Sequence, residues 1–298
     1  MNDGGYLAVD VGGTKLEVGV VSDDRRLLYR SRCATPPHDV WNSLESLIVE
    51  NLEWARTHRV ETISCGVGCG GPMDLARRTV SPLHIPQWRD FPLERRIAEL
   101  ASLPVIVDND AKALVRAEWW SRTTAGTSAV PASLMSIVMG TGVGAGIILN
   151  GTLLHGRTGN AGHIGHVIVE PDGNVCECGA RGCLEAHVSG RALQQLIGGR
   201  PDAASVALRD RIGRWLGVAI ATTAATVDLV DVTLGGSVAL GLGDELCRLA
   251  QTAAREHAGL SMIRNLTVSL VADRELAPLF GAAGLAKYPS PYEPDLPR

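Results

Sequence analysis

"DVGGTKLEVGVV" (residues 10–21) joins a Gly/Thr turn to a run of β-branched residues. With "YLAVDV" (6–11) before it and "RLLYRSR" (26–32) after it, the pattern indicates short strands separated by turns. We therefore expect an antiparallel meander at the start of the fold. A related stretch, "MGTGVGAGIILNG" (139–151), follows near the middle of the chain. Two similar lobes would produce this echo, but Gly/Thr turns before strands are common and are the simpler explanation of the echo alone.

The rest of the chain alternates between helical and strand patterns. Helical spacing is clearest at 41–56, where Leu44, Leu47, Ile48 and Leu52 recur on one face. The other expected helices cover 93–101, 111–120, 203–227, 244–257 and 275–286. The other expected strands cover 61–67, 104–109, 133–140, 143–151, 231–236 and 266–271. This alternation is typical of an α/β protein.

Composition limits the classes of function. The 298 residues include 45% hydrophobic and 20% charged residues, which suits a protein with a sizeable core. The net charge is −4 and no Lys/Arg run stands out, so no nucleic-acid partner is expected. The chain has neither a signal-peptide pattern nor a long apolar run, so we expect a cytoplasmic protein with no membrane partner. The expected partner is a small molecule.

"HIGHVIVEPDGNVCECGARGCLEA" (163–186) concentrates three of the seven cysteines. Thiolates and imidazole are the ligands that zinc prefers, so His166, Cys176, Cys178 and Cys183 predict a closed, structural zinc site. The glycines of "GARG" (179–182) would allow the tight reversal that this site needs. Coincidence or a disulfide fits less well, because the cysteines crowd into one short stretch of a chain that we expect to be cytoplasmic.

Two glycine-rich stretches do not fit the usual dinucleotide or P-loop motifs. "GVGCGG" (66–71) matches G-x-G-x-x-G, but Pro72 predicts a turn where a Rossmann fold needs a helix. "GTGVGAG" (140–146) continues into a strand and an "NG" hairpin signal (150–151). A G-x-x-x-x-G-K-[ST] motif is absent from the sequence. Such loops can still present backbone N–H groups to phosphate oxygens.

"VDNDAKA" (107–113) places polar groups at the end of a buried strand. Asp108, Asn109 and Asp110 are more than an N-cap of the following helix requires. The carboxyl ends of such strands are where α/β folds bind ligands.

Taken together, the motifs resemble the ROK family of sugar kinases. "DVGGTK", "VDNDA", "GTGVGAGI", "GNAGHIGH", "CECGARGCLEA" and "LGGS" occur in the order and rough spacing of that family, over nearly the whole chain. "SPLHIPQW" (81–88) is similar to the segment these kinases carry over the sugar pocket. The resemblance implies an actin-like ATPase (hexokinase-type) α/β fold with two lobes around a central cleft. The small lobe would be 1–112, completed by a C-terminal helix at 277–298, and the large lobe would be 113–276.

The resemblance also implies roles for individual residues. Asp110 matches the catalytic base, and the residues that would bind the sugar are Gly71, Asn109, Asp110, His163, His166 and Glu185. The residues that would bind ATP are Asp10, Gly12, Gly13, Thr14, Lys15, Gly140, Thr141, Gly142, Gly235 and Gly236, with Mg²⁺ held through water near Asp10. His166 would hold the sugar while it also ligates the zinc.

The implied activity is ATP-dependent phosphorylation of the 6-hydroxyl of a hexose or amino sugar by a homodimer. N-acetylmannosamine, kanosamine and glucosamine are candidate substrates, and a glucokinase acting on glucose is the alternative. A second alternative is a catalytically weak sugar-sensing protein. The family's repressors carry a DNA-binding domain ahead of the DxGGT motif, and we do not expect one because the motif here begins at Asp10.

The chain departs from the family at one position. The usual pattern is Glu-x-Gly-His, but His163 stands where the family has the glutamate. "AGHIGH" (161–166) resembles N-acetylmannosamine kinases, whereas "GGPMD" (70–74) and "HIPQW" (84–88) resemble glucokinases. We hypothesise that His163 favours an amino sugar, although it can instead simply support the zinc ligand His166.

Overall fold

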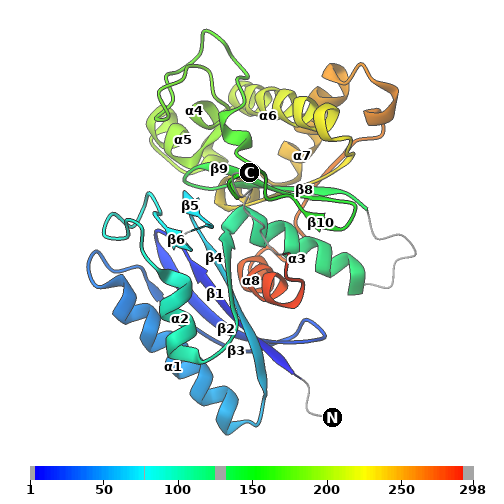
Figure 1. The fold of residues 1–298 in the computed structure, drawn as a ribbon. Helices are drawn as coiled ribbons and strands as arrows, with labels where there is room; N and C mark the ends of the chain where they lie inside the picture. The colour runs from blue at the N-terminus through cyan, green and yellow to red at the C-terminus, as the bar shows by residue number, and fades with distance from the viewer. Residues whose placement is uncertain (1–3, 77, 125–131, 291–298) are drawn as a thin grey trace, which may run out of the picture. The chain divides into compact units, whose positions relative to one another are not determined.

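The computed structural model describes residues 4–76, 78–124 and 132–290, and its contacts divide the chain into two compact units (Figure 1). The first unit comprises 1–128, 155–161 and 275–298, and the second comprises 129–154 and 162–274. The boundary expected at residue 112 falls inside α3 (Asp110–Thr124), and this helix groups with the first unit. Residues 155–161 also group with the first unit, which the sequence did not indicate.

The first unit is built on a five-stranded sheet in the order β3-β2-β1-β4-β7. β1 pairs antiparallel with β2, and β2 with β3, so the predicted meander is confirmed. β4 and β7 continue the sheet parallel to β1. The strands are β1 (Gly5–Val11), β2 (Lys15–Ser22), β3 (Leu27–Ala34), β4 (Thr62–Cys69) and β7 (Val105–Asn109), and β5 (Met73–Asp74) pairs with β6 (Thr79–Val80) in a separate small ladder.

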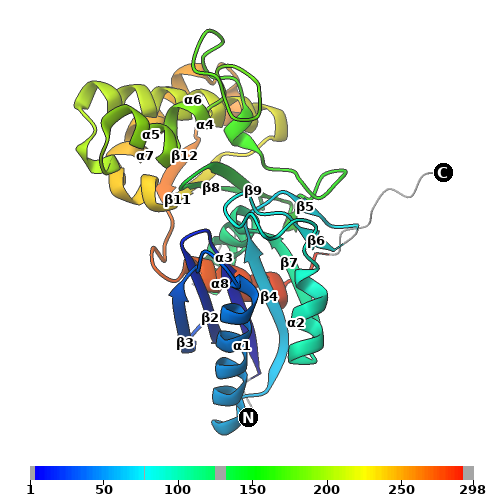
Figure 2. The same cartoon turned by 90° about the vertical axis from the view of Figure 1, so that its left-hand side faces the viewer.

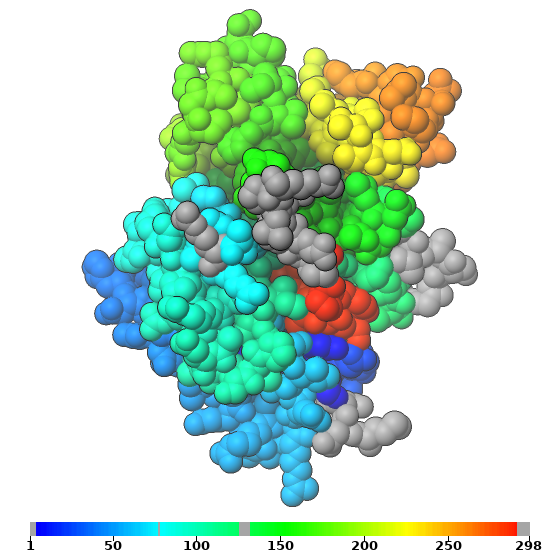
Figure 3. Space-filling view, viewed as in Figure 1, coloured from blue at the N-terminus to red at the C-terminus, as the bar shows by residue number. Residues whose placement is uncertain are grey.

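The helices of this unit pack on its sheet. α8 (Ala277–Lys287) contacts β1, β4 and α3, whereas α1 (Val40–Thr57) contacts β2, β3 and α2 (Leu93–Ala101). Figure 2 shows α1 and α2 along the sheet, and part of α8, in red, reaches the surface of the unit in Figure 3. No helix follows the glycines at the end of β4, because the chain continues into β5. The exclusion of a Rossmann motif there is therefore confirmed.

The second unit repeats the strand order of the first. Its sheet runs β10-β9-β8-β11-β12, with β8, β9 and β10 antiparallel and with β11 and β12 parallel to β8. The β8–β9 hairpin therefore occupies the place of the β1–β2 hairpin, and the Gly/Thr echo is a repeat of topology. Asn150 (φ 50°) and Gly151 (φ 77°) form the predicted two-residue turn between β9 and β10. The strands are β8 (Leu134–Met139), β9 (Val143–Leu149), β10 (Thr152–Leu153), β11 (Asp231–Gly235) and β12 (Thr267–Leu270).

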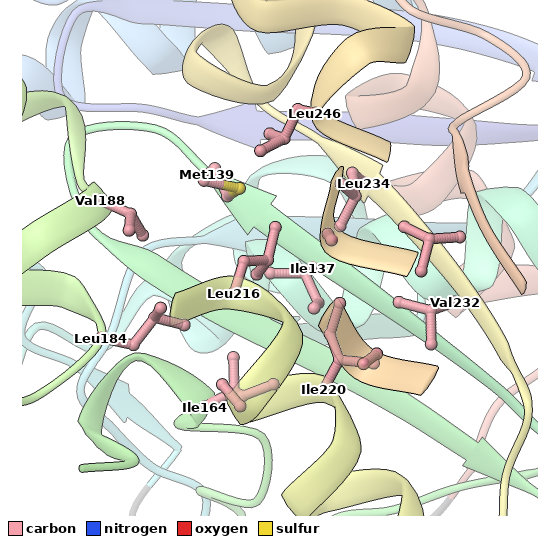
Figure 4. Packing of buried hydrophobic residues seen from close by; sticks show 14 of the residues in the cluster. Ile137, Met139, Ile164, Leu184, Val188, Leu216, Ile220, Val232, Leu234 and Leu246 are labelled. Atoms are coloured by element: carbon pink, nitrogen blue, oxygen red, sulfur yellow. The ribbon is translucent and has the colours of Figure 1, made fainter. Parts of the chain in front are cut away.

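Two long helices, α6 (Val206–Val227) and α7 (Ser237–His257), pack together in the second unit. Figure 4 shows Leu216 and Ile220 of α6 close to Ile137 of β8 and Val232 of β11, in one buried apolar cluster. The remaining short elements are α4 (Glu185–Val188), α5 (Gly190–Ile197) and the 3₁₀ turns η1 (Ile164–His166), η2 (Pro201–Ala203) and η3 (Ser261–Ile263). In the part of the chain that the structure describes, no helix is both long enough and apolar enough to cross a membrane.

Two helical regions differ from the sequence expectation. α7 begins at Ser237, well before the predicted start at residue 244, and Gly243 (φ 68°, ψ −157°) interrupts its helical geometry. The helical spacing is clear only after that glycine, which is why the first turns escaped notice. α4 and α5 are short and were not predicted.

Candidate functional site

Polar residues of both predicted strand-end motifs meet at one edge of the first sheet. Asp10 of β1 is level with Gly68 of β4, and Gly68 is level with Asp108 of β7. Asn109 is the last residue of β7, and Asp110 is the first residue of α3. The motifs "DVGGTK" and "VDNDA" therefore lie at the carboxyl ends of two parallel strands, β1 and β7, that flank β4. The carboxyl ends of parallel strands are where α/β folds place their ligands.

Asp110 opens α3 with an exposed carboxylate. Its Oδ1 accepts a hydrogen bond from the Ala111 N–H at 2.8 Å, and Asn109 Oδ1 accepts from the same N–H at 3.0 Å. The start of the helix thus has two acceptors for one donor and does not depend on either side chain alone. Surrounding protein atoms remove part of the hydration of Asp110 and raise its pKa, whereas the Ala111 N–H and His84 act to lower it. A carboxylate made more basic in this way suits proton transfer.

Asp10 lies in a charged cluster that includes Lys15. The Nζ of Lys15 is 3.9 Å from Asp10 Oδ2 and also contacts the carboxylate of Glu17, which is 1% exposed. Arg30 Nε lies 2.6 Å from the other oxygen of Glu17. Burial raises the pKa of Asp10 to about 7; Lys15 acts against this shift, while Asp110 and Glu17 add to it. The buried Glu17 thus holds Lys15 beside Asp10, where the carboxylates of Asp10, Glu17 and Asp110 are close together.

The turn at 12–14 between β1 and β2 is held by its own backbone and by Thr35. The Gly12 N–H donates to Lys15 O at 2.9 Å, and the Thr35 hydroxyl donates to Gly12 O at 2.7 Å. A hollow of about 180 Å³ opens beside this turn and is lined by Gly13, Thr35, Pro36, Pro37, Val40, His84, Ile85, Pro86 and Gln87. The segment "SPLHIPQW" therefore borders the "DVGGTK" turn.

Gly71 lies beside Asn109, as the sequence-based assignment of both to one site requires. A Cβ placed on Gly71 would be 3.4 Å from Asn109 Nδ2, and the Gly71–Pro72 peptide bond is cis. The Asn160 side chain donates to the Met73 carbonyl at 3.2 Å, so segment 155–161 reaches the same part of the first unit.

The four residues predicted to bind zinc come together in the second unit. One ligand atom from each of His166, Cys176, Cys178 and Cys183 lies within 4.8 Å of the other three. The Sγ atoms of Cys178 and Cys183 are 3.7 Å apart, and Cys176 Sγ is 3.7 Å from His166 Nδ1. Zinc bonds of ~2.3 Å to sulfur and ~2.0 Å to nitrogen give a tetrahedron with edges of roughly 3.5–3.8 Å. The donor set and its spacing fit zinc, and all seven cysteines are free thiols.

The loop that carries the cysteines reverses as predicted at "GARG". Gly179 and Gly182 have φ values of 92° and 82°, which glycine adopts readily. Ile164 and Leu184, on either side of the loop, are buried in the core of the second unit (Figure 4). Burial and the neighbouring thiols of Cys178 and Cys176 raise the pKa of Cys183 to about 12. A bound cation would reverse that shift, because the thiolate is the form that ligates metal.

Glu185 connects this loop to the turn of the β8–β9 hairpin. Its Oε2 accepts a hydrogen bond from the Val143 N–H at 2.7 Å. The Gly190 N–H donates to the Gly140 carbonyl at 2.7 Å and holds the other side of the turn. Glu185, assigned by the family resemblance to the sugar, therefore also fixes the "GTG" turn (140–142) assigned to ATP.

Replacing Gly142 with alanine is expected to lower the free energy of unfolding by about 1–2 kcal/mol. The new Cβ would lie 2.7 Å from Glu185 Oε2, so the carboxylate must move and lose its bond to Val143. Chemical denaturation measures the change. Gly140→Ala is the matched control, because a Cβ there has open space around it. Equal losses in the two variants would contradict the role given to Glu185.

The remaining predicted site residues lie in the second unit. His163 is exposed at the start of η1, and its ring stacks on that of His166 with centroids 6.1 Å apart and 18° between the planes. Gly235 and Gly236 form the turn between β11 and α7, where Gly236 has φ 89°. Thr141 is exposed in the turn of the β8–β9 hairpin. His163 is thus a direct neighbour of a predicted zinc ligand.

Comparison with known proteins agrees with these motifs. A model of the ROK family matches residues 6–288. The chain belongs to the ROK family. Among ROK relatives, an N-acetylmannosamine kinase of Citrobacter koseri is 34% identical over 94% of this chain and 98% of that protein. A glucokinase of Streptomyces coelicolor is 31% identical over 96% of this chain and 98% of that protein. The relatives are sugar kinases.

Solved structures of ROK proteins show the same fold. The ROK hexokinase of Thermus thermophilus superposes with a TM-score of 0.78 at 30% identity, covering 94% of this chain and 96% of that one. A ROK glucokinase of Streptomyces griseus, solved with glucose and AMPPNP, gives 0.77 at 29% identity, covering 95% of this chain and 99% of that one. The predicted actin-like ATPase (hexokinase-type) fold is confirmed.

Two neighbours of the predicted site residues were not found from the sequence. Glu17 interrupts the apolar run "LEVGVV" (16–21), and a lone charge in such a run is a signal for a buried, paired side chain. His155, whose Nδ1 lies 3.4 Å from Asp108 Oδ2, is in a loop without a recognisable pattern, so no local signal points to it.

Proposed function

We propose that this ROK protein is an ATP-dependent kinase that phosphorylates the 6-hydroxyl of a hexose or amino sugar. The observation that carries the proposal is the exposed Asp110 carboxylate, whose pKa is raised, beside Asn109 and on the same sheet edge as Asp10. Phosphoryl transfer needs mainly positioning and charge neutralisation, plus one carboxylate to accept the proton of the attacking hydroxyl. In this proposal Asp110 is that base, and Asn109 and Gly71 hold the sugar.

The hairpin turns supply the groups for ATP. The turn at 12–14 with Lys15 and the turn at 140–142 both offer backbone N–H groups to phosphate oxygens, and Gly235 and Gly236 would lie against the adenosine. Mg²⁺ bound with ATP would be held through water near Asp10, which fits a cation because Asp110 and Glu17 add negative charge there. The cation would neutralise charge on the transferred phosphoryl group.

The zinc in this proposal is structural. Four protein ligands would leave no open coordination position, so the cluster of His166, Cys176, Cys178 and Cys183 would hold the metal and thereby fix the loop and the orientation of His166. With Nδ1 of His166 toward the cluster, its other ring nitrogen stays available to a sugar hydroxyl. His163 and Glu185 would complete the sugar contacts in this unit. A homodimer, as the family resemblance implies, is part of the proposal.

An amino sugar is the substrate class we favour, with N-acetylmannosamine first, then kanosamine and glucosamine. The likeness to N-acetylmannosamine kinases and the imidazole at position 163 support it. Unlike a carboxylate, neutral imidazole offers one donor and one acceptor, so it recognises a different substituent. A glucokinase acting on glucose is the alternative, supported by relatives at 30% and 31% identity.

A coupled assay of ADP release with glucose, N-acetylmannosamine, kanosamine and glucosamine tests this proposal. We expect ATP-dependent turnover of at least one sugar, with phosphate on O6 as shown by NMR of the product. A catalytically weak sensor would instead bind a sugar in calorimetry without turnover. That result would contradict the proposed kinase activity and support the sugar-sensing alternative.

His163→Glu is expected to shift preference toward glucose. Restoring the family's carboxylate should change the ratio of kcat/KM for glucose and the amino sugar by ~1–3 kcal/mol, the contribution of one polar contact. His58→Glu, at an exposed histidine after α1, is the control and should leave the ratio unchanged. If His163→Glu also leaves the ratio unchanged, His163 only supports His166 and does not select the sugar.

A further inference from the structure

Lys112 is a buried ammonium with a complete set of hydrogen-bond acceptors. Its side chain is 1% exposed, and its Nζ lies 2.9 Å from Asp108 Oδ1. The same Nζ lies 2.7 Å from the Gly159 carbonyl and 3.3 Å from His155 Nδ1. An ammonium has three N–H donors, so each has one partner here. Burying a charge is costly unless it is paired and hydrogen-bonded in this way.

The partners of His155 place a proton on one of its ring nitrogens. His155 Nε2 lies 2.9 Å from the Ser290 carbonyl, which can only accept, so Nε2 carries a proton. Its Nδ1 lies 3.3 Å from Lys112 Nζ and 3.4 Å from Asp108 Oδ2, and it accepts from Lys112 when the ring is neutral. Burial lowers the pKa of His155, which favours this neutral ring. Asp108, 2% exposed, also accepts from the Asn109 N–H at 2.8 Å.

This network joins two segments that are far apart in the sequence. Asp108 and Lys112 stand on either side of Asn109 and Asp110, the residues proposed to bind and deprotonate the sugar hydroxyl. The other partners, His155 and Gly159, belong to segment 155–161, after which the chain enters the second unit immediately before His163. One side chain therefore ties the end of β7 to the segment that leads into the proposed sugar ligands.

We propose that Lys112 is a positioning residue for sugar phosphorylation. The inference rests on the proposed kinase function. Lys112 acts through the backbone of residues 108–111 and through segment 155–161. Because the Asp110 carboxylate accepts a hydrogen bond from the Ala111 N–H, its direction follows the backbone that Lys112 braces. Small displacements of a catalytic group are costly even when the altered residue does not touch the substrate.

Lys112→Met, which keeps length but removes charge and donors, tests the proposal. We expect kcat/KM for the sugar to fall between about tenfold and about 100-fold, with a raised sugar KM and an unchanged KM for ATP. The melting temperature should also fall, because the buried Asp108 carboxylate loses its ammonium partner. Loss of stability alone would reduce the amount of active enzyme without changing either KM.

The double variant Asp108→Asn/Lys112→Met separates positioning from charge compensation. Removing both charges should restore most of the melting temperature, but His155 and Gly159 still lack their donor, so the raised sugar KM should persist. Glu118→Gln is the control on α3; it alters a pair with Arg122 at 3.5 Å and should leave both KM values unchanged.

Three results would overturn the inference, and they are distinguishable. An unchanged sugar KM in Lys112→Met, measured below its unfolding transition, would show that Lys112 does not position the site. If the double variant regains both the wild-type sugar KM and the wild-type melting temperature, Lys112 serves only to neutralise the charge of Asp108. Absence of turnover by the wild-type protein with every sugar would remove the proposed function itself, and this inference with it.

Discussion

Replacing Asp110 with asparagine is expected to lower kcat by about 10²–10⁴-fold or more, the range that general-base catalysis contributes. The amide cannot accept the proton of the sugar hydroxyl. Its oxygen can still accept from the Ala111 N–H, and Asn109 Oδ1 is a second acceptor for that donor. The fold and sugar binding should therefore survive. Steady-state kinetics gives kcat, and titration calorimetry gives the sugar affinity.

Asp244→Asn is the matched control for that prediction. It makes the same chemical change at an exposed carboxylate on α7, and kcat should stay within about twofold of wild type, as for most surface substitutions. Near wild-type turnover in Asp110→Asn would show that another group accepts the proton.

Loss of the Cys₃His metal is expected to be the second large effect. Purified protein should contain about one zinc per chain. Cys178→Ser should lower zinc content, stability and activity together, because metal binding contributes to the free energy of folding. A ligand present at ~1,000 times its Kd stabilises the folded state by about 4 kcal/mol, and we expect a loss of that order. Elemental analysis and thermal unfolding measure the two quantities.

Cys33→Ser provides the control for the metal prediction. Cys33 is a partly buried thiol of β3 outside the cluster, so this variant should keep its zinc. Adding zinc back to chelated wild-type protein should restore activity, but should not do so for Cys178→Ser. Full activity of a metal-free preparation would contradict the structural role.

Local chemistry explains why much of the fold and site was predictable from the sequence. The strands around "GGT" and "GTG", the "NG" turn and the reversal at "GARG" depend on residues that are neighbours in the chain. The clustering of the four predicted zinc ligands was predictable for the same reason, because the three cysteines are close in sequence and their type is specific. The position of Asp110 followed from a strand and a helix that meet at one residue.

Contacts between distant segments were not predictable. The bond of Glu185 to the Val143 N–H spans 42 residues, and that of Lys112 to the Gly159 carbonyl spans 47. Nothing in the local pattern of a helix marks a lysine as buried when its partners lie in an irregular loop. For this reason the sequence did not predict that residues 155–161 belong to the first unit. The early start of α7 was missed for a local reason, because its helical spacing is clear only after Gly243.

The place of α8 in the first unit sets an order for folding during synthesis. β1 is made first, yet α8, which packs on β1 and β4, is made last. Apart from residues 155–161, the second unit comes from one continuous stretch, 129–274, that precedes α8. Because domains fold as units while the chain emerges from the ribosome, the second unit can complete its core while the first still exposes the face that α8 will cover. The sheet of the first unit must therefore remain able to bind α8 until that helix leaves the ribosome. Until then its uncovered face is accessible to chaperones.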